Sequence, residues 1–405
     1  MEYIEQVKLI NKNSRLFLIG NVLSSVGFGA FFVLFNLYLQ KTGISMKYIG
    51  GVNSAFSMGV AIFAFFAGVM SDRIGRKTSF IVSSSVQVAA FLFLILSRLP
   101  ILLILFAFVM GSASSLFVVS QNPFLLENST PVERPSLFSL EMTTLILGEF
   151  IGSLLGGFLP NFFGGNAIGM QKALFISLFL ILCSIIPFVF IDESWEAKDF
   201  SENFLSSVKA PFVVLKNDFK RKAIVSIFVS AQFLIGLGAG FVVPFFNLYF
   251  RSRFHLSVSE IGIIFSVGSI VIAIGTLFSP FMRKKFGKLK SVVITQSSSI
   301  PFVLILAFTK NIYFAVVSFL FRGMIMNAAV PIENQLFMES IPEQSKAAIS
   351  AFMQIAWNFS WGISSVISGF LMAKYGFSIL FMLMLVFYIS SISVLYFGLK
   401  EKIDE

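Results

Sequence analysis

Two charged residues fall inside long apolar stretches of the sequence, where ionisable groups are rare and costly. Glu149 lies within SLEMTTLILGEFIGSLLGG (139–157), and Arg322 lies within the apolar run that begins near residue 311. A carboxyl group in such surroundings can bind and release a proton, and a guanidinium can bind an anionic or zwitterionic group. The two residues are therefore candidates for a substrate or coupling site.

Both charges are expected far from the ends of the helices that carry them. At the rise of an α-helix, Glu149 lies about 18 Å from one end of its helix and Arg322 about 16 Å from the end of its own. Both depths are near the middle of an apolar layer of ~30 Å. We expect the two groups to neutralise each other, with a substrate or a proton competing for the pairing. The alternative is that each charge finds a local partner.

Four further polar residues are candidates for the same site. Asn36 and Asn247 occupy equivalent places in the repeated phrases FNLYLQ (35–40) and FNLYFR (246–251), either as gate contacts or as helix-ending residues of an interfacial tyrosine belt. Asn327 accompanies Arg322 on the same expected helix, and Glu141 precedes Glu149 on its own. Glu141 is expected near the helix end, together with Glu127, Glu333 and Glu339, where water or a basic side chain can reach it.

Composition decides which solvent surrounds these residues. Hydrophobic residues make up 57% of the 405 residues and charged residues only 12%, far from the ~25% charged that is usual in soluble proteins. The apolar runs have the length of about 20 residues that a bilayer requires of a helix. The sequence predicts an all-α integral membrane protein with twelve transmembrane helices, near 16–39, 48–70, 78–97, 100–126, 137–163, 173–191, 223–250, 259–282, 290–309, 311–336, 347–373 and 376–398.

An internal repeat divides these helices into two sets of six. The two Asn-Leu-Tyr phrases stand 211 positions apart, and Gly27 and Gly29 precede the first as Gly238 and Gly240 precede the second. Such register over a fixed distance indicates a duplication. We therefore predict two pseudo-symmetric six-helix bundles, at 1–192 and 223–405, which a cytosolic linker at 193–222 connects.

The basic residues of the chain are distributed unevenly between the two ends of the predicted helices. With both termini placed inside, 21 of the 30 lysines and arginines fall in inner segments and eight in outer loops. This asymmetry follows the positive-inside rule, so the net charge of +10 reports orientation and does not indicate a nucleic-acid partner. The charged start MEYIEQVKLINKNSR has no cleavage site of a signal peptide. We expect a multi-pass protein of the cytoplasmic membrane, with both termini in the cytoplasm.

The connection between the second and third predicted helices has an unusual pattern, GVMSDRIGRK at 68–77. Its glycines permit a close helix approach and a tight turn, and its acid can bond the N-terminus of a neighbouring helix. An ordinary basic anchor would explain the arginines and the lysine but not the acid and both glycines. The motif comprises Gly68, Asp72, Arg73, Gly75, Arg76 and Lys77.

Twelve spans, a six-plus-six repeat and G-x-x-x-D-R-x-G-R-K together resemble the major facilitator superfamily of transporters. The second copy, PFMRKKFGK (280–288), keeps Gly287 and the bases but has Lys284 in place of the acid. The resemblance implies alternating access of two bundles about a central site. It also implies that Asp72 stabilises one conformational state.

A second stretch resembles the drug:proton antiporter branch of that family. Small residues recur on one face of the predicted helix 137–163, a pattern that permits close packing. These are Gly148, Gly152, Gly156 and Gly157. The resemblance is partial, because Ser153 stands where that motif has proline and Ala107 where the antiporters have an arginine. Glycine packing without any meaning for export is the alternative.

The sequence offers no nucleophile and base pair, no phosphate-binding glycine loop and no cluster of metal ligands, so we expect neither an enzyme nor a metal or cofactor. The expected partners are a small-molecule substrate and the lipid bilayer, and the expected state is a monomer. The leading hypothesis is export of a small organic solute driven by the proton gradient. The alternatives are uptake or exchange of an anionic or zwitterionic metabolite through Arg322, and a membrane sensor that transports nothing.

Overall fold

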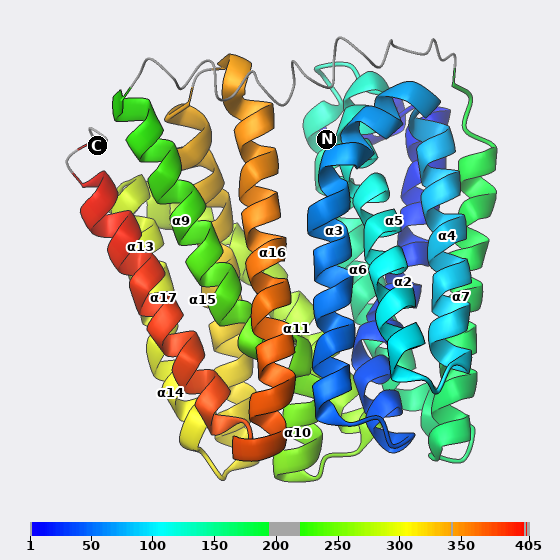
Figure 1. Cartoon of the computed structure of the whole chain (residues 1–405). Coiled ribbons are helices and arrows are strands. Elements are labelled where there is room, and N and C mark those ends of the chain that lie inside the picture. Colours follow the sequence, from blue (N-terminus) through cyan, green and yellow to red (C-terminus); the bar gives the residue numbers. More distant parts are fainter. Residues whose placement is uncertain (1, 194–218, 342, 401, 403–405) are drawn as a thin grey trace. The chain divides into compact units, whose positions relative to one another are not determined.

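The computed structural model describes residues 2–193, 219–341, 343–400 and 402, and in these ranges the regular structure is helical (Figure 1). Most of the predicted linker at 193–222 therefore lies outside the described residues. The first half contains α1 (Glu2–Leu9), α2 (Lys12–Lys41), α3 (Met46–Ile74), α4 (Arg76–Leu96), α5 (Pro100–Glu127), α6 (Arg134–Phe162) and α7 (Ala167–Val189). The second half contains α9 (Phe219–Val242), a short 3-10 helix η1 (Val243–Phe245), α10 (Phe246–Phe254), α11 (Val258–Leu277), α12 (Ser279–Phe286), α13 (Lys288–Ser298), α14 (Ile300–Phe308), α15 (Ile312–Glu339), α16 (Glu343–Tyr375) and α17 (Ser378–Leu399).

The predicted membrane fold is confirmed. Within the described residues, eleven helical segments are long and apolar enough to cross a bilayer. The remaining predicted span, 347–373, lies within α16, a helix of 33 residues. A helix of this length exceeds the ~30 Å that the apolar core requires.

Three spans of the second half are interrupted where their counterparts in the first half are continuous. Pro244, Pro280 and Pro301 each stand at the first or second position of a new helical segment. Proline has no backbone N–H and its ring clashes with the preceding turn, so it begins a helix more readily than it continues one. The segments on either side still form single membrane spans, such as Lys222–Phe254.

The helices gather into two compact units, which are described separately. Unit 1 consists of Met1–Ser45, Met58–Phe200 and His255–Ser269, and its core contains the buried rings of Phe17, Phe80, Phe124 and Phe188. The Phe17 ring centroid lies 5.1 Å from that of Phe80 and 5.3 Å from that of Phe124. Aromatic pairs at such distances add to the stability that their buried area provides.

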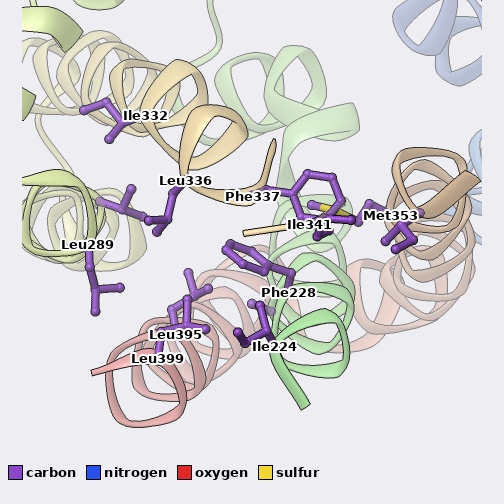
Figure 2. Packing of buried hydrophobic residues seen from close by; sticks show 13 residues of the cluster. Ile224, Phe228, Leu289, Ile332, Leu336, Phe337, Ile341, Met353, Leu395 and Leu399 are labelled. Atoms are coloured by element: carbon purple, nitrogen blue, oxygen red, sulfur yellow. The ribbon is translucent and has the colours of Figure 1, made fainter. Parts of the chain in front are cut away.

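Unit 2 consists of Met46–Ser57, Ser201–Phe254 and Ile270–Glu405. One of its buried clusters is shown in Figure 2, where Phe228 of α9 and Phe337 of α15 meet with ring centroids 5.3 Å apart. Ile224, Leu395 and Leu399 bring α9 and α17 together in the same cluster. Each half of the chain therefore builds apolar helix contacts of its own.

Each unit also takes in the first turns of one helix from the opposite half, through a glycine crossing. In unit 2, an ideal Cβ on Gly50 of α3 would lie 2.7 Å from the Cα of Gly369 in α16. In unit 1, an ideal Cβ on Gly262 of α11 would lie 2.6 Å from the Cα of Gly157 in α6. Backbones this close exclude any side chain. Gly50 corresponds to Gly262 in the repeat, and Gly157 corresponds to Gly369, so the two crossings are copies of one another.

Candidate functional site

Glu149 lies in α6 where this helix crosses α2. An ideal Cβ on Gly29 would lie 2.8 Å from the carbonyl oxygen of Glu149, so the two backbones touch at this position. The residue is partly buried, and among the described residues no hydrogen bond or ion pair reaches its carboxyl group. Its surroundings in unit 1 therefore leave the carboxyl oxygens available to a proton or a ligand.

Arg322 lies in α15 and is only 7% exposed. Its Nη2 donates a hydrogen bond to the hydroxyl of Tyr388 in α17. The guanidinium carbon lies 5.7 Å from the centroid of the Tyr388 ring and 5.9 Å from that of Phe246 in α10, distances at which a cation is attracted by a ring face. Nε is buried and has no hydrogen-bond partner.

The two deep charges thus have different local surroundings. Arg322 has the local partner that the alternative interpretation expected, although that partner is a neutral hydroxyl and not an acid. Glu149 has no such partner among the described residues. Because the two residues belong to different units, their mutual pairing stays a prediction.

Two further carboxyl groups are buried in the spans, and both accept hydrogen bonds from glutamine. Glu141 of α6 is 8% exposed and accepts from Gln121 of α5 at 2.5 Å. Glu333 of α15 is 5% exposed and accepts from Gln232 of α9 at 2.8 Å and from Gln296 of α13 at 3.2 Å. The structure therefore differs from the expectation that water or a basic side chain reaches them. Their partners are neutral amides from neighbouring helices.

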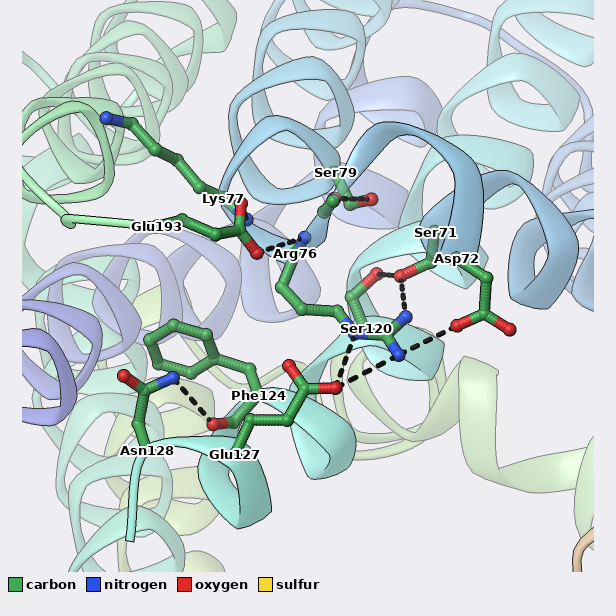
Figure 3. A network of polar contacts seen from close by, with 11 residues as sticks. Ser71, Asp72, Arg76, Lys77, Ser79, Ser120, Phe124, Glu127, Asn128 and Glu193 are labelled. Atoms are coloured by element: carbon green, nitrogen blue, oxygen red, sulfur yellow. Dashed lines mark hydrogen bonds and ion pairs between the residues drawn. The ribbon is translucent and has the colours of Figure 1, made fainter. Parts of the chain in front are cut away.

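The motif between α3 and α4 forms the polar network of Figure 3. The Arg76 guanidinium, whose side chain is 7% exposed, forms ion pairs with Asp72 at 2.7 Å and with Glu127 of α5 at 3.3 Å. It also donates to the Ser71 hydroxyl at 2.7 Å. Ser71 in turn lies 2.7 Å from Ser120 of α5. Arg76 thereby ties α5 to the turn between α3 and α4.

The turn itself depends on Gly75, which has φ 86° and ψ 163° and stands between α3 and α4. A side chain is strained in this left-handed region. Gly68, by contrast, has space around it, because an ideal Cβ there would lie 3.7 Å from the Val119 side chain, an ordinary contact distance. The close helix approach expected at Gly68 is therefore absent.

Glu193 and not Asp72 bonds a helix N-terminus in unit 1. Its two carboxyl oxygens accept from the backbone N–H groups of Arg76 at 2.7 Å and Lys77 at 3.0 Å, at the first turn of α4 (Figure 3). An anion at this end of a helix satisfies free N–H groups and interacts favourably with the helix dipole. Arg73 is exposed at the end of α3.

The second half repeats this arrangement with other residues. Lys288 forms an ion pair with Glu339, and the two are 51 positions apart, as are Arg76 and Glu127. Gly287 stands before Lys288 with φ 76°, as Gly75 stands before Arg76. The duplication is therefore visible in ionic contacts as well as in the helices.

Asn36 and Asn247 are 5% and 1% exposed, so neither lies at an open surface. The tyrosines of the two phrases are buried as well, and each donates to a backbone carbonyl 57 positions later: Tyr38 to Ile95 at 2.8 Å and Tyr249 to Leu306 at 2.7 Å. The repeated phrase therefore joins the first membrane span of each half to the third, through α2 and α4 in the first half and through α10 and α14 in the second. It does not form a solvent-facing belt.

The remaining candidates have local roles. Asn327 donates to the carbonyl of Gly323, one turn earlier in α15, at 2.9 Å. Three glycines of α6, Gly148, Gly152 and Gly156, face α2. Ideal Cβ atoms on them would lie, in that order, 2.5 Å from the Ser25 Cβ, 2.2 Å from the Val26 carbonyl oxygen and 2.9 Å from the Ala30 Cα. Gly157 faces α11 instead.

Sequence reasoning did not identify several of the residues that complete these contacts. Tyr388, Glu193 and the three glutamines are remote in sequence from their partners, and only a comparison of the two repeats could have drawn attention to them. Among the described residues, no group of three His, Cys, Asp or Glu residues is arranged to hold a metal ion.

Comparison with known proteins gives a consistent result. The model of the Major Facilitator Superfamily matches residues 17–362 and 228–404. The chain is 27% identical over 382 residues to the multidrug resistance protein MdtG of Proteus mirabilis, covering 89% of each protein. It is 24% identical over 371 residues to the uncharacterized MFS-type transporter YceJ of Bacillus subtilis, covering 88% of this chain and 89% of that protein.

Solved structures show the same fold. The crystal structure of the nucleoside transporter NupG matches with a TM-score of 0.74 at 17% identity, covering 97% of this chain and 99% of that chain. A bacterial homologue of the human lysosomal transporter Spinster, in an inward-facing and unoccupied conformation, matches with a TM-score of 0.74 at 14% identity, covering 96% and 97%. At these identities the likeness concerns the fold.

Proposed function

The chain belongs to the major facilitator superfamily, and on this premise we propose that it exports a small organic solute by alternating access, driven by the proton gradient. It is a multi-pass membrane transporter and not an enzyme. Similarity to a multidrug resistance protein supports export, because the chain and that protein match over 89% of their lengths. The substrate class, the direction of transport and the coupling ion are our proposal.

The main support for this proposal is the environment of the Glu149 carboxyl group. The residue is partly buried at the α2–α6 crossing, and no described residue donates a hydrogen bond to its carboxyl group. An ionised carboxylate at such depth costs at least ~2.5 kcal/mol unless a partner compensates it. A proton removes this cost, and a change of access that hydrates the group favours its release. Such a group can couple proton flow to the conformational change.

Arg322 supplies the opposite charge. We propose that Glu149 and Arg322 approach one another when the site is empty, and that a solute or a proton competes for this pairing. A ligand shifts the equilibrium between two conformations only by its differential affinity for them. If Glu149 and Arg322 pair in only one conformation, a solute or proton that competes with this pairing has different affinities for the two conformations.

The test is transport by Glu149→Gln in proteoliposomes. Glutamine keeps the shape of the side chain but cannot exchange a proton, so proton-driven transport should be lost while solute counterflow, which needs no net proton movement, persists. Asp192→Asn is the matched control, because it removes an exposed carboxyl outside the spans and should transport at the native rate. Native proton-driven transport by Glu149→Gln would contradict the proposed role.

We further propose that the protein lies in the cytoplasmic membrane with both termini in the cytoplasm, which places Lys77 on the inner side. The support is the distribution of 21 inner and eight outer basic residues. A Lys77→Cys variant in a Cys183→Ser background should react with an impermeant maleimide only after the membrane is opened. Labelling in intact cells would show the opposite orientation.

Uptake or exchange of an anionic or zwitterionic metabolite is the second candidate function. The buried guanidinium of Arg322 favours it, because among the described residues no acid pairs with this charge. The two candidates differ in the sense of proton coupling. Export by antiport is driven by protons that move opposite to the solute, whereas uptake by symport is driven by protons that move with it.

A further inference from the structure

The duplication of the chain provides an internal comparison for Arg322. In this part of the repeat, residues correspond at a distance of 212, as shown by Glu127 and Glu339 in the matching ion pairs. Arg322 therefore corresponds to Met110 of α5, which is fully buried. The fold accepts an uncharged thioether at this place in the first half, so the repeated architecture does not require a guanidinium there.

The same comparison applies to Tyr388, the partner of Arg322. In the second half, an ideal Cβ on Gly238 would meet the Tyr388 ring at 2.7 Å and the carbonyl oxygen four residues earlier at 3.2 Å. In the first half, the equivalent Gly27 meets the Ile181 side chain at 2.5 Å and the carbonyl oxygen four residues earlier at 2.7 Å. Ile181 thus stands where Tyr388 stands. Two apolar residues of the first half, Met110 and Ile181, are thus replaced in the second half by two polar residues that share a hydrogen bond.

Among the described residues, no anion pairs with the charge of Arg322. Of the five N–H groups of the guanidinium, one donates to Tyr388, while Nε is buried without a partner. The rings of Tyr388 and Phe246 attract the cation through their faces, but neither ring carries a net negative charge that would neutralise it. A buried charge is usually compensated by a hydrogen-bonded partner of opposite sign. Within the described residues, none fills this role.

We propose that Arg322, held in place by Tyr388, is an anion-binding site, and that the transported solute is an amphipathic organic anion. A carboxylate, sulfonate or phosphate matches the planar fork of a guanidinium, which can donate two parallel hydrogen bonds to it. The apolar part of the solute would lie against aromatic side chains such as Phe246. This inference rests on the proposed function only in that a solute is transported, and it holds for export and uptake alike.

The experiment measures binding to the purified full-length protein in nanodiscs, so that it does not depend on transport. The probes share one naphthalene ring and differ in their head groups: 2-naphthoate, 2-naphthalenesulfonate, neutral 2-naphthamide and a naphthylmethyl trimethylammonium cation. Isothermal titration calorimetry gives Kd for each. The native protein should bind the two anions at least about tenfold more tightly than the amide, as a charge-assisted contact predicts.

Arg322→Met is the decisive variant, because methionine is the residue that the first half holds at the equivalent place and should preserve the fold. It should bind the two anions at least about tenfold more weakly while its Kd for the amide stays within about twofold. Arg322→Lys keeps a positive charge and should bind the anions more tightly than Arg322→Met but less tightly than the native protein. Tyr388→Phe removes only the hydroxyl that positions Arg322 and should weaken anion binding by about threefold.

Two outcomes would overturn the proposal: equal anion affinity in the native protein and Arg322→Met, or equal loss of anion and amide binding in this variant. Titration in phosphatidylcholine nanodiscs is repeated in nanodiscs containing phosphatidylglycerol. If phosphatidylglycerol weakens binding of the anionic probes to the native protein but not to Arg322→Met, the result supports an anion site at Arg322 that lipid headgroups also enter. If the native protein binds the anions but shows no proton-driven flux, the proposed coupling is contradicted and the anion site is not.

Discussion

Replacement of Arg76 by alanine should destabilise the protein far more than loss of another ion pair at a comparable distance. Arg76 is the centre of the network in Figure 3: its guanidinium contacts Asp72 at 2.7 Å, Glu127 at 3.3 Å and Ser71 at 2.7 Å. Its side chain is 7% exposed, whereas the two carboxylates are 45% and 49% exposed. The cation is therefore buried and its partners are half in solvent.

The magnitude follows from this difference in burial. A hydrogen bond to a charged group contributes about 1.5–3 kcal/mol when it is buried, but a half-exposed carboxylate regains water once its partner is removed. We therefore expect Arg76→Ala to lower the free energy of unfolding by about 2–3 kcal/mol in all, including the packing of the side-chain stem. Lys12→Ala is the control. Lys12 pairs with Asp192 at 2.8 Å, but the side chains are 68% and 77% exposed, so water screens the pair and the expected loss is smaller than for Arg76→Ala.

The assay is unfolding of the purified protein in mixed micelles with increasing denaturing detergent, followed by tryptophan fluorescence. Native protein, Arg76→Ala and Lys12→Ala are compared under the same conditions, and the differences in free energy are read from the transition midpoints and slopes. If Arg76→Ala loses no more stability than Lys12→Ala, burial of the guanidinium does not stabilise the turn between α3 and α4, and the reasoning is refuted.

Three further predictions test other contacts. Asp72→Asn should cost below about 1 kcal/mol of stability, because the carboxylate is 45% exposed, but should slow proteoliposome transport several-fold; native transport at normal expression would make the motif a mere anchor. Tyr249→Phe leaves the Leu306 carbonyl without this donor and should cost about 1–3 kcal/mol in the same micelle assay, whereas an unchanged midpoint would show that the bond contributes nothing. The hydrogen bond and charge of Lys12 hold the pKa of Asp192 below its ordinary value, so this contact is fully present above the ordinary pKa and is lost as pH falls through the lowered one. Lys12→Ala should return the pKa of Asp192 to its usual range in isotope-edited infrared titration, and an unshifted titration would refute the assignment.

Much of the fold is predictable because the bilayer imposes it on the sequence. Predicted spans such as 78–97 and 100–126 end within a few residues of α4 (Arg76–Leu96) and α5 (Pro100–Glu127). The breaks at Pro244 and Pro301 were not predicted, since a span broken by proline keeps the same apolar length and composition. Hydropathy reports burial in lipid and does not report local backbone geometry.

The candidate site was harder to predict because its contacts join distant helices. Helix rise predicts how far Arg322 lies from the end of its helix, but its partner Tyr388 lies 66 positions away on α17 and cannot be found from α15 alone. For the same reason, Glu333 was expected within reach of water, while the structure surrounds it with glutamine amides from two other helices. Helix rise and hydropathy predict which residues lie far from the ends of a membrane helix. They do not predict which of these residues contact one another across helices.

Solute flux in proteoliposomes, with and without an imposed pH difference, tests the central claim most directly. The purified native protein is reconstituted and presented with a panel of dyes, sugars and organic anions, and Glu149→Gln is reconstituted in parallel. Export by proton antiport predicts that an acidic lumen drives accumulation of at least one organic solute, that a protonophore abolishes this accumulation, and that Glu149→Gln does not show it. Accumulation that is the same with and without the pH difference, or that requires an alkaline lumen, would contradict proton-driven export.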